Sequence, residues 1–157
     1  MLTTSQLTTL KNYIVADPVL SLQPNNEDGA YEIARVINLT ATPDFIVWKT
    51  MVATSEIMNN GFVWSVVDGL TNGKARIWEW MSMNGSINPS RPNVRQGLVD
   101  CFGAASAMAT SIAPHLKRSA TVLEKIFATG TGTTASPATM AVEGQISYQE
   151  VYQALNS

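Results

Sequence analysis

Apolar residues recur with helical spacing from the start of the chain. Thr3 and Gln6 have the spacing of a capping box, in which each side chain bonds the other residue's backbone N–H. The apolar residues that follow share one face of the predicted helix: Leu7, Leu10 and Ile14. Asn25 can cap a second helix, whose apolar face repeats the spacing: Ala30, Ile33, Ala34 and Ile37. The pattern therefore predicts two amphipathic helices before residue 40.

The next segment carries further start and stop signals. Thr42, Pro43 and Asp44 are typical of a helix start, because they combine a cap, a first-turn proline and an acid near the helix dipole. The helix they open would place three apolar residues on one side: Phe45, Trp48 and Val52. A helical turn is expected over residues 55–60. Residues 62–70, FVWSVVDGL, are compatible with a strand or a buried helix, because an apolar run this short does not distinguish the two by its periodicity.

Three more helices are predicted up to residue 128. One runs from Leu70 to the Asn84-Gly85 stop and packs three residues inward: Ile77, Trp78 and Met81. The longest follows Pro92 and keeps one apolar stripe until Pro114: Val94, Leu98, Cys101, Phe102, Ala105, Met108, Ala109 and Ile112. The last spans residues 119–128, with Thr121 and Glu124 as a capping box.

The pattern changes after residue 128. Residues 129–139 are rich in Gly, Thr, Ser and Pro, which predicts a linker. Apolar and polar residues then alternate from Met140 to Tyr148, as in a strand or a hairpin turning at Glu143-Gly144, while Ser147 can also start a helix. The predicted fold is mainly α: a compact body of five to seven helices over residues 1–128, the linker, and a docking arm over residues 140–157.

The arm is the first candidate interface. A strand can add to the edge of a neighbour's sheet, and these residues would make the contact: Met140, Val142, Ile146, Tyr148, Val151 and Tyr152. The alternative is that the arm folds back on its own body. Trp80 joins the candidates because it lies about 200° from Trp78 on the predicted helix, so both indoles cannot face inward.

Composition adds a reason to expect partners. Charged residues make up only 14% of the chain, below the ~25% usual for globular domains, so other subunits can be expected to cover part of the surface. A monomer coated with Thr, Ser and Asn is the alternative. The net charge is −2, yet basic residues concentrate in the middle of the chain. These residues could form a face that binds DNA or an acidic partner, and the alternative is a helix face exposed to solvent. The residues are Lys74, Arg76, Arg91, Arg95, Lys117 and Arg118.

Catalytic and metal motifs are not found. The single cysteine, Cys101, lies in an apolar run and is expected to be buried, and the single histidine, His115, lies in a predicted loop. The glycines of residues 69–73 and 130–132 do not have the spacing or context of a phosphate-binding loop. We therefore expect no enzyme activity, no cofactor and no metal. No stretch predicts a signal peptide or membrane helix, so a cytosol-like compartment is expected.

Four short segments spread over most of the chain add a resemblance. They are PDFIVWKT (43–50), RPNVRQGL (91–98), FATGTGT (127–133), and EG followed by QEV (143–144 and 149–151). Together they resemble a group of small proteins encoded in the structural gene modules of tailed phages. None of the segments is diagnostic of a reaction.

This resemblance implies a virion protein that is assembled in the host cytoplasm. The role it implies is a neck or head–tail connector protein, which forms a ring of identical copies beneath the portal protein and also contacts other neck or tail proteins. A tail terminator and a capsid-decorating protein are alternatives from the same setting, and a DNA-contacting protein is an alternative of another class. The expected mechanism is mechanical.

Overall fold

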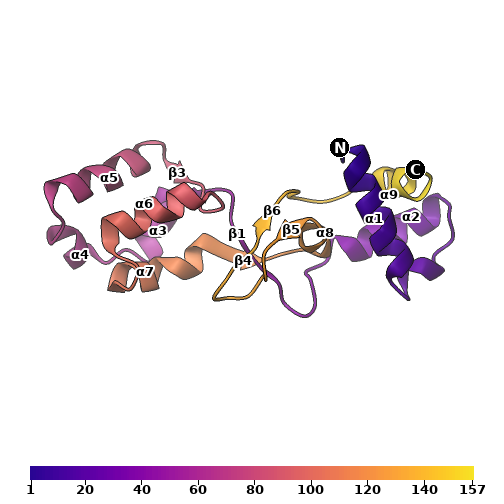
Figure 1. Ribbon diagram of the computed structural model, residues 1–157, viewed down its shortest axis with the longest axis horizontal. Helices are drawn as coiled ribbons and strands as arrows, with labels where there is room; N and C mark the ends of the chain where they lie inside the picture. The colour runs from indigo at the N-terminus through magenta and orange to yellow at the C-terminus, as the bar shows by residue number, and fades with distance from the viewer. The chain divides into compact units, whose positions relative to one another are not determined.

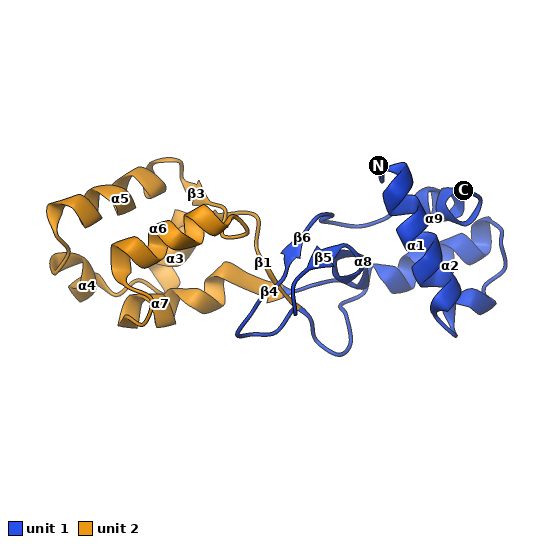
Figure 2. Ribbon diagram, viewed as in Figure 1, with its two compact units in different colours: residues 1–45, 119–157 blue, residues 46–118 orange.

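The structure is mainly α, as the sequence predicts. A computed structural model describes residues 1–157 and contains nine α-helices and three two-stranded sheets (Figure 1). Nine helices exceed the predicted five to seven. The chain forms two compact units (Figure 2): unit 1 comprises residues 1–45 and 119–157, and unit 2 comprises residues 46–118. Unit 2 is thus inserted in the sequence between the two segments of unit 1.

Unit 1 is built mainly by helices from both ends of the chain. Its elements are α1 (Thr4–Ala16), η1 (Leu20–Leu22), α2 (Glu27–Ile37), α8 (Val122–Ile126), β5 (Ala128–Thr129), β6 (Thr139–Met140) and α9 (Tyr148–Leu155). Helix α9 lies beside both α1 and α2 (Figure 1). Their apolar faces form one core with α8 and η1: Leu7, Leu10, Ile14, Leu20, Ala30, Ile33, Ala34, Ile37, Leu123, Ile146, Val151 and Ala154. Burial of these faces removes the apolar surface that single amphipathic helices would leave in water.

Local capping chemistry fixes several helix starts in unit 1. Both predicted capping boxes are present, Thr3 with Gln6 at α1 and Thr121 with Glu124 at α8. Helix α2 is capped by Asn26, one residue after the predicted Asn25. Ser147 makes a third capping box at α9, so the helix interpretation of residues 147–155 is confirmed.

The segment predicted to be a linker has a different structure. β5 and β6 pair antiparallel, with Ala128 opposite Met140 and Thr129 opposite Thr139, so residues 130–138 are the loop of a hairpin. Gly132 lies so close to the ring of Phe45 that a Cβ there would come within 2.2 Å of Cε2. Because the loop packs on its own unit, it does not act as a free linker between a body and an arm.

The division of the sequence into residues 1–128, 129–139 and 140–157 is therefore corrected. Residues 140–157 belong to unit 1, where Ile146, Val151 and Ala154 are buried in the core and Val142 packs against it. The predicted strand is limited to β6, and residues 148–155 of the supposed arm form α9. In this fold Ile146 and Val142 pack on the chain's own helices, which is the second of the two alternatives that the sequence left open.

Unit 2 has its own core. Its elements are β1 (Ile46–Trp48), β2 (Val52–Ala53), α3 (Thr54–Asn60), α4 (Trp64–Asp68), α5 (Asn72–Met83), β3 (Ser86–Ile87), α6 (Pro92–Phe102), α7 (Ala107–Ile112), η2 (Ala113–Leu116) and β4 (Lys117–Ser119). β1 pairs with β4 and β2 with β3. The buried cluster is Val52, Ile57, Trp78, Ile87, Leu98, Cys101, Phe102, Met108, Ile112 and Leu116. Phe62, Trp78 and Phe102 meet with ring centroids 5.2–6.2 Å apart, which suits edge and tilted aromatic packing.

Two predicted helices between residues 42 and 114 are corrected. The Thr42-Pro43-Asp44 signal does not open a helix; instead Ile46–Trp48 is a strand, in keeping with the β-branched and aromatic residues that it contains. The predicted helix up to Pro114 is two helices, because Gly103 adopts φ +86° and ends α6 before Ser106 caps α7. The ambiguous segment 62–70 contains the short helix α4, which has no buried residue.

Candidate partner-binding site

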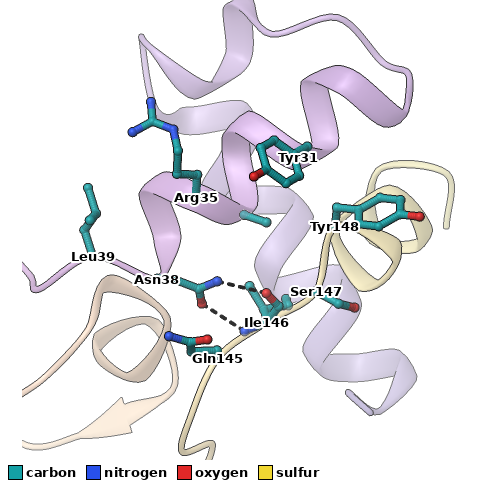
Figure 3. Close-up of a pocket in the computed structure, with 9 residues that line it drawn as sticks. Tyr31, Arg35, Asn38, Leu39, Gln145, Ile146, Ser147 and Tyr148 are labelled. Atoms are coloured by element: carbon teal, nitrogen blue, oxygen red, sulfur yellow. Dashed lines mark hydrogen bonds between the residues drawn. The ribbon is translucent and has the colours of Figure 1, made fainter.

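A groove on unit 1 runs between the second half of α2 and the start of α9. Its volume is about 450 Å³. The residues that line it come from α2 and from residues 145–148: Tyr31, Ala34, Arg35, Asn38, Leu39, Gln145, Ile146, Ser147 and Tyr148. We call it the Tyr31 groove, and Figure 3 shows its side chains.

Asn38 holds the floor of the Tyr31 groove together. Its Nδ2 donates to the carbonyl of Ile146 at 2.9 Å, and its Oδ1 accepts from the N–H of Ile146 at 2.9 Å (Figure 3). The side-chain amide therefore pairs with the backbone of Ile146 as a neighbouring strand would. This fixes residues 145–148 against the end of α2 and positions Tyr148 beside the groove.

The walls of the Tyr31 groove are aromatic and accessible. Tyr31 is 60% exposed and Tyr148 is 37% exposed, and Leu39 is also exposed. Arg35 is the only basic residue in the lining, and its guanidinium pairs with Glu32 at 2.9 Å. Such a combination of aromatic surface and a few polar groups suits the burial of a partner's apolar side chain.

Unit 2 presents an exposed indole on α5. Trp80 is 59% exposed, and the guanidinium of Arg76 lies 5.3 Å from its ring centroid, one helical turn away. Exposed Met83 follows Trp80 on the same side of the helix. A hollow of about 360 Å³ adjoins it, lined by Trp80, Met81, Asn84, Ser86, Ile87, Asn88 and Val94. We call Arg76, Trp80, Met83 and this hollow the Trp80 patch.

A second indole of unit 2 has the same exposure but a different setting. Trp64 is also 59% exposed, and it packs edge-on against Phe62 at 4.7 Å. Asp68 lies one turn further along α4 and is exposed. Trp80 thus stands beside the cation Arg76 on a helix that also carries exposed Glu79, whereas Asp68 is the one charged residue of the Trp64 helix.

The structure separates the predicted interface residues. Ile146 and Val151 are buried in the unit 1 core, and Met140 and Val142 are half-buried in the same unit. Tyr148 and Tyr152 are partly exposed on α9, and only Tyr148 lines the Tyr31 groove. Tyr31 and Leu39 were missed by the sequence argument, although Tyr31 lies outside the apolar repeat of α2 and could have been noticed for that reason.

The predicted basic face is only partly available. Lys74 and Arg76 are exposed on α5, and Arg91 is exposed at the start of α6. Arg95 donates from Nη1 to the carbonyls of Pro89 at 2.7 Å and Ser90 at 3.0 Å. Its guanidinium also lies 4.8 Å from the Trp48 ring centroid, and burial lowers its pKa.

The remaining predicted basic residues are Lys117 and Arg118, which are half-buried in β4. All six predicted basic residues belong to unit 2, but no single element gathers them. The structure therefore offers individual cations for a partner's acids, and Arg76 is the one placed beside an exposed aromatic ring.

The single cysteine and histidine occupy structural positions. The predicted burial of Cys101 is confirmed; its thiol donates to the Lys74 carbonyl at 3.3 Å, and burial raises its pKa. His115 lies in η2, where its ring lies close to Gly61. No three His, Cys, Asp or Glu side chains gather in a way that could hold a metal ion. None of the helices is long and apolar enough to cross a lipid bilayer.

Comparison with known proteins adds no relative. No protein-family model, curated protein or solved structure matches this chain.

Proposed function

We propose that this chain is a structural protein of a tailed-phage virion, a neck or head–tail connector that forms a ring beneath the portal and joins head to tail. It would be made in the host cytoplasm and assemble with the portal and with other neck or tail proteins. Its work would be mechanical, since it would hold two parts of the particle together through binding energy.

Exposed aromatic side chains on a charge-poor surface carry this proposal. Trp64 and Trp80 are each 59% exposed and Tyr31 is 60% exposed, while only 14% of the residues are charged. Tryptophan and tyrosine are the residues that most often anchor protein interfaces, and low charge is typical of interface cores. The phage-module resemblance of residues 43–50, 91–98 and 127–133 supplies the setting in which such a surface would be covered.

Particles that lack this protein test the proposed position. Negative-stain images should show DNA-filled heads without attached tails, together with free tails, because the joint between the two would be missing. Supplying the protein in trans should restore tailed particles. Tailed particles with aberrantly long tails would instead indicate a tail terminator, and fragile heads with normal tails would indicate a decorating protein. Either result would contradict the connector role.

Binding to the portal gives a second readout. The chain should comigrate with assembled portal protein as a multimer of defined mass, and it should not retard duplex DNA at low salt. DNA binding that weakens steeply as salt rises would favour the DNA-contacting alternative, because such binding releases condensed counterions.

A further inference from the structure

Charge is divided unequally between the two units. Unit 2 carries seven Lys or Arg residues and four Asp or Glu residues, a net charge of +3. The two segments of unit 1 together carry three basic and eight acidic residues, a net charge of −5. Opposite potentials steer association and set its orientation. Two copies of this chain are therefore complementary when unit 1 of one copy meets unit 2 of the other.

The acidic side of this match adjoins the Tyr31 groove. Glu27 and Asp28 are exposed in the first turn of α2, and Tyr31 follows them by one turn, so these residues share a side of the helix. The one basic side chain in the groove lining, Arg35, already has Glu32 as a partner. The groove thus has aromatic walls, and two exposed acids lie one helical turn before Tyr31.

The basic side of the match is the Trp80 patch. Arg76 lies over the Trp80 ring, and exposed Arg91 lies next to the hollow through Asn88, whose carbonyl accepts from the Arg91 N–H at 3.2 Å. Exposed Glu79 on α5 offsets part of this charge, but Arg76 and Arg91 together leave the Trp80 patch positive. Trp64 is equally exposed, but the one charged residue of its helix is Asp68, which would repel the acids of a partner. Charge therefore selects Trp80 over Trp64 as the indole that meets unit 1.

We propose that Trp80 of one copy binds in the Tyr31 groove of a second copy, with Arg76 next to the acidic start of α2. This inference rests on the proposed ring function, for which it names the contact between neighbouring copies. The two surfaces belong to different units and are not self-complementary. A contact between unlike surfaces is heterologous, and it repeats from copy to copy and closes into a ring when the rotation allows.

Truncation of the two aromatic residues tests the contact. The isolated protein should associate as its concentration rises, and sedimentation velocity at low salt should resolve species larger than one chain. Trp80→Ala should raise the dissociation constant at least tenfold, which is the usual loss at an interface anchor. Trp64→Ala is the matched control, because its indole is equally exposed, and it should leave the constant within about twofold.

The other side of the contact has its own pair of variants. Tyr31→Ala should weaken association to a similar extent, whereas Tyr13→Ala, at an exposed position of α1 outside the groove, should not. A mass of one chain at every concentration, or equal effects of Trp80→Ala and Trp64→Ala, would overturn the proposal.

Exchange of charges gives a sharper test, because one pair of substitutions should abolish self-association and the complementary pair should restore it. The variant Glu27→Arg with Asp28→Arg should not self-associate, nor should Arg76→Glu with Arg91→Glu. An equimolar mixture of the two variants should associate, since each then meets a partner of opposite charge, and the chain carrying all four changes should associate alone. A folding defect cannot produce this rescue. Failure of both rescues, with native helical circular dichroism retained, would refute the contact.

Single-charge controls accompany the exchange. Lys74→Glu alters the same helix about 200° from Arg76, and Asp44→Arg alters an exposed position of unit 1 outside the groove. Both should leave association largely unchanged.

The contact and the proposed function can fail separately. The charge exchange could restore association while particles that lack this protein still look normal. That result would contradict the connector role and support the contact between copies. Conversely, particles without this protein could lack tails while particles with the Trp80→Ala variant have tails and intact rings. That result would support the connector role and exclude the contact through Trp80.

Discussion

Asn38 and Ile146 are joined by two hydrogen bonds of 2.9 Å each, one in each direction, between a side-chain amide and a backbone peptide unit. The two residues are 108 positions apart in the chain. This pair fastens the C-terminal segment of unit 1 to α2 and forms the floor of the Tyr31 groove.

Removal of the Asn38 side chain should destabilise unit 1. Asn38→Ala leaves the N–H and C=O of Ile146, a buried residue, without their partners, which costs about 1–3 kcal/mol in the free energy of unfolding. Urea denaturation followed by far-UV circular dichroism measures the change. Asn12→Ala, at an exposed position of α1, is the control and should shift the midpoint little. Equal midpoints for the two variants would contradict the structural role of Asn38.

Deletion of residues 140–157 should unfold unit 1. The deletion removes Ile146, Val151 and Ala154 from the core, so α1 and α2 would expose the apolar faces that α9 covers. The helical circular-dichroism signal should fall by more than the loss of α9 alone explains, and proteolysis within residues 1–45 should become fast. A truncated chain that keeps α1 and α2 protected would show that α9 is an appendage.

Two glycines should respond to alanine in opposite ways. Gly132 has φ +65° and lies against the Phe45 ring, so Gly132→Ala should lower the unfolding free energy by more than about 1 kcal/mol. Gly73 lies in α5 with open space around it, and Gly73→Ala should raise stability by about 0.5–1 kcal/mol through helix propensity. Thermal unfolding of both variants tests the pair, and a harmless Gly132→Ala would mean that the hairpin loop does not pack on Phe45.

Stability should depend on pH through Glu150. Burial raises the pKa of its carboxyl, but the N–H groups of Ser147 and Leu2, the Met1 α-amino group and the Ser147 hydroxyl outweigh burial and lower the pKa overall. A lowered native pKa stabilises the fold above the unfolded value of about 4.3, and this contribution disappears as pH falls through the native pKa.

The matching variant is Glu150→Gln. It should be less stable than the wild type at neutral pH and lose less stability on acidification, measured as urea midpoints from about pH 6 to about pH 3. Asp44→Asn, which removes an exposed carboxyl from the same unit, serves as the control. Parallel pH profiles for the wild type and Glu150→Gln would contradict the contribution of this carboxylate.

Local signals predicted much of the helical structure. The capping boxes at Thr3 and Thr121 and the apolar faces of α1 and α2 follow from spacing within a few residues, and the structure confirms them. Composition predicted a linker at residues 129–139, where the structure has a hairpin loop. The loop is held by the contact of Gly132 with Phe45, and composition cannot indicate a contact between positions so far apart in the chain. At Gly103, the continuing apolar stripe concealed a residue with positive φ that ends the helix.

The candidate site was less accessible to sequence reasoning. Trp80 was found because helical geometry forbids it to share the face of Trp78, an argument that needs only one helix. The Tyr31 groove requires the pairing of Asn38 with Ile146, which no local pattern indicates. The alternating pattern predicts an interface position for Ile146, and the helical pattern after Ser147 predicts one for Val151, because both patterns mark an apolar side without showing which surface covers it.

The insertion of unit 2 into unit 1 has a consequence for the order of folding. Pairing of β1 with β4 brings the two ends of the inserted segment together, so a folded unit 2 connects residues 45 and 119 across a short gap. A disordered segment of the same length would add roughly 4 kcal/mol of length-dependent closure entropy to the formation of unit 1. We therefore expect protection of the buried Cys101 thiol to precede full recovery of helical signal during refolding. During synthesis on the ribosome, the apolar faces of α1 and α2 would therefore stay partly exposed until α9 has been synthesised.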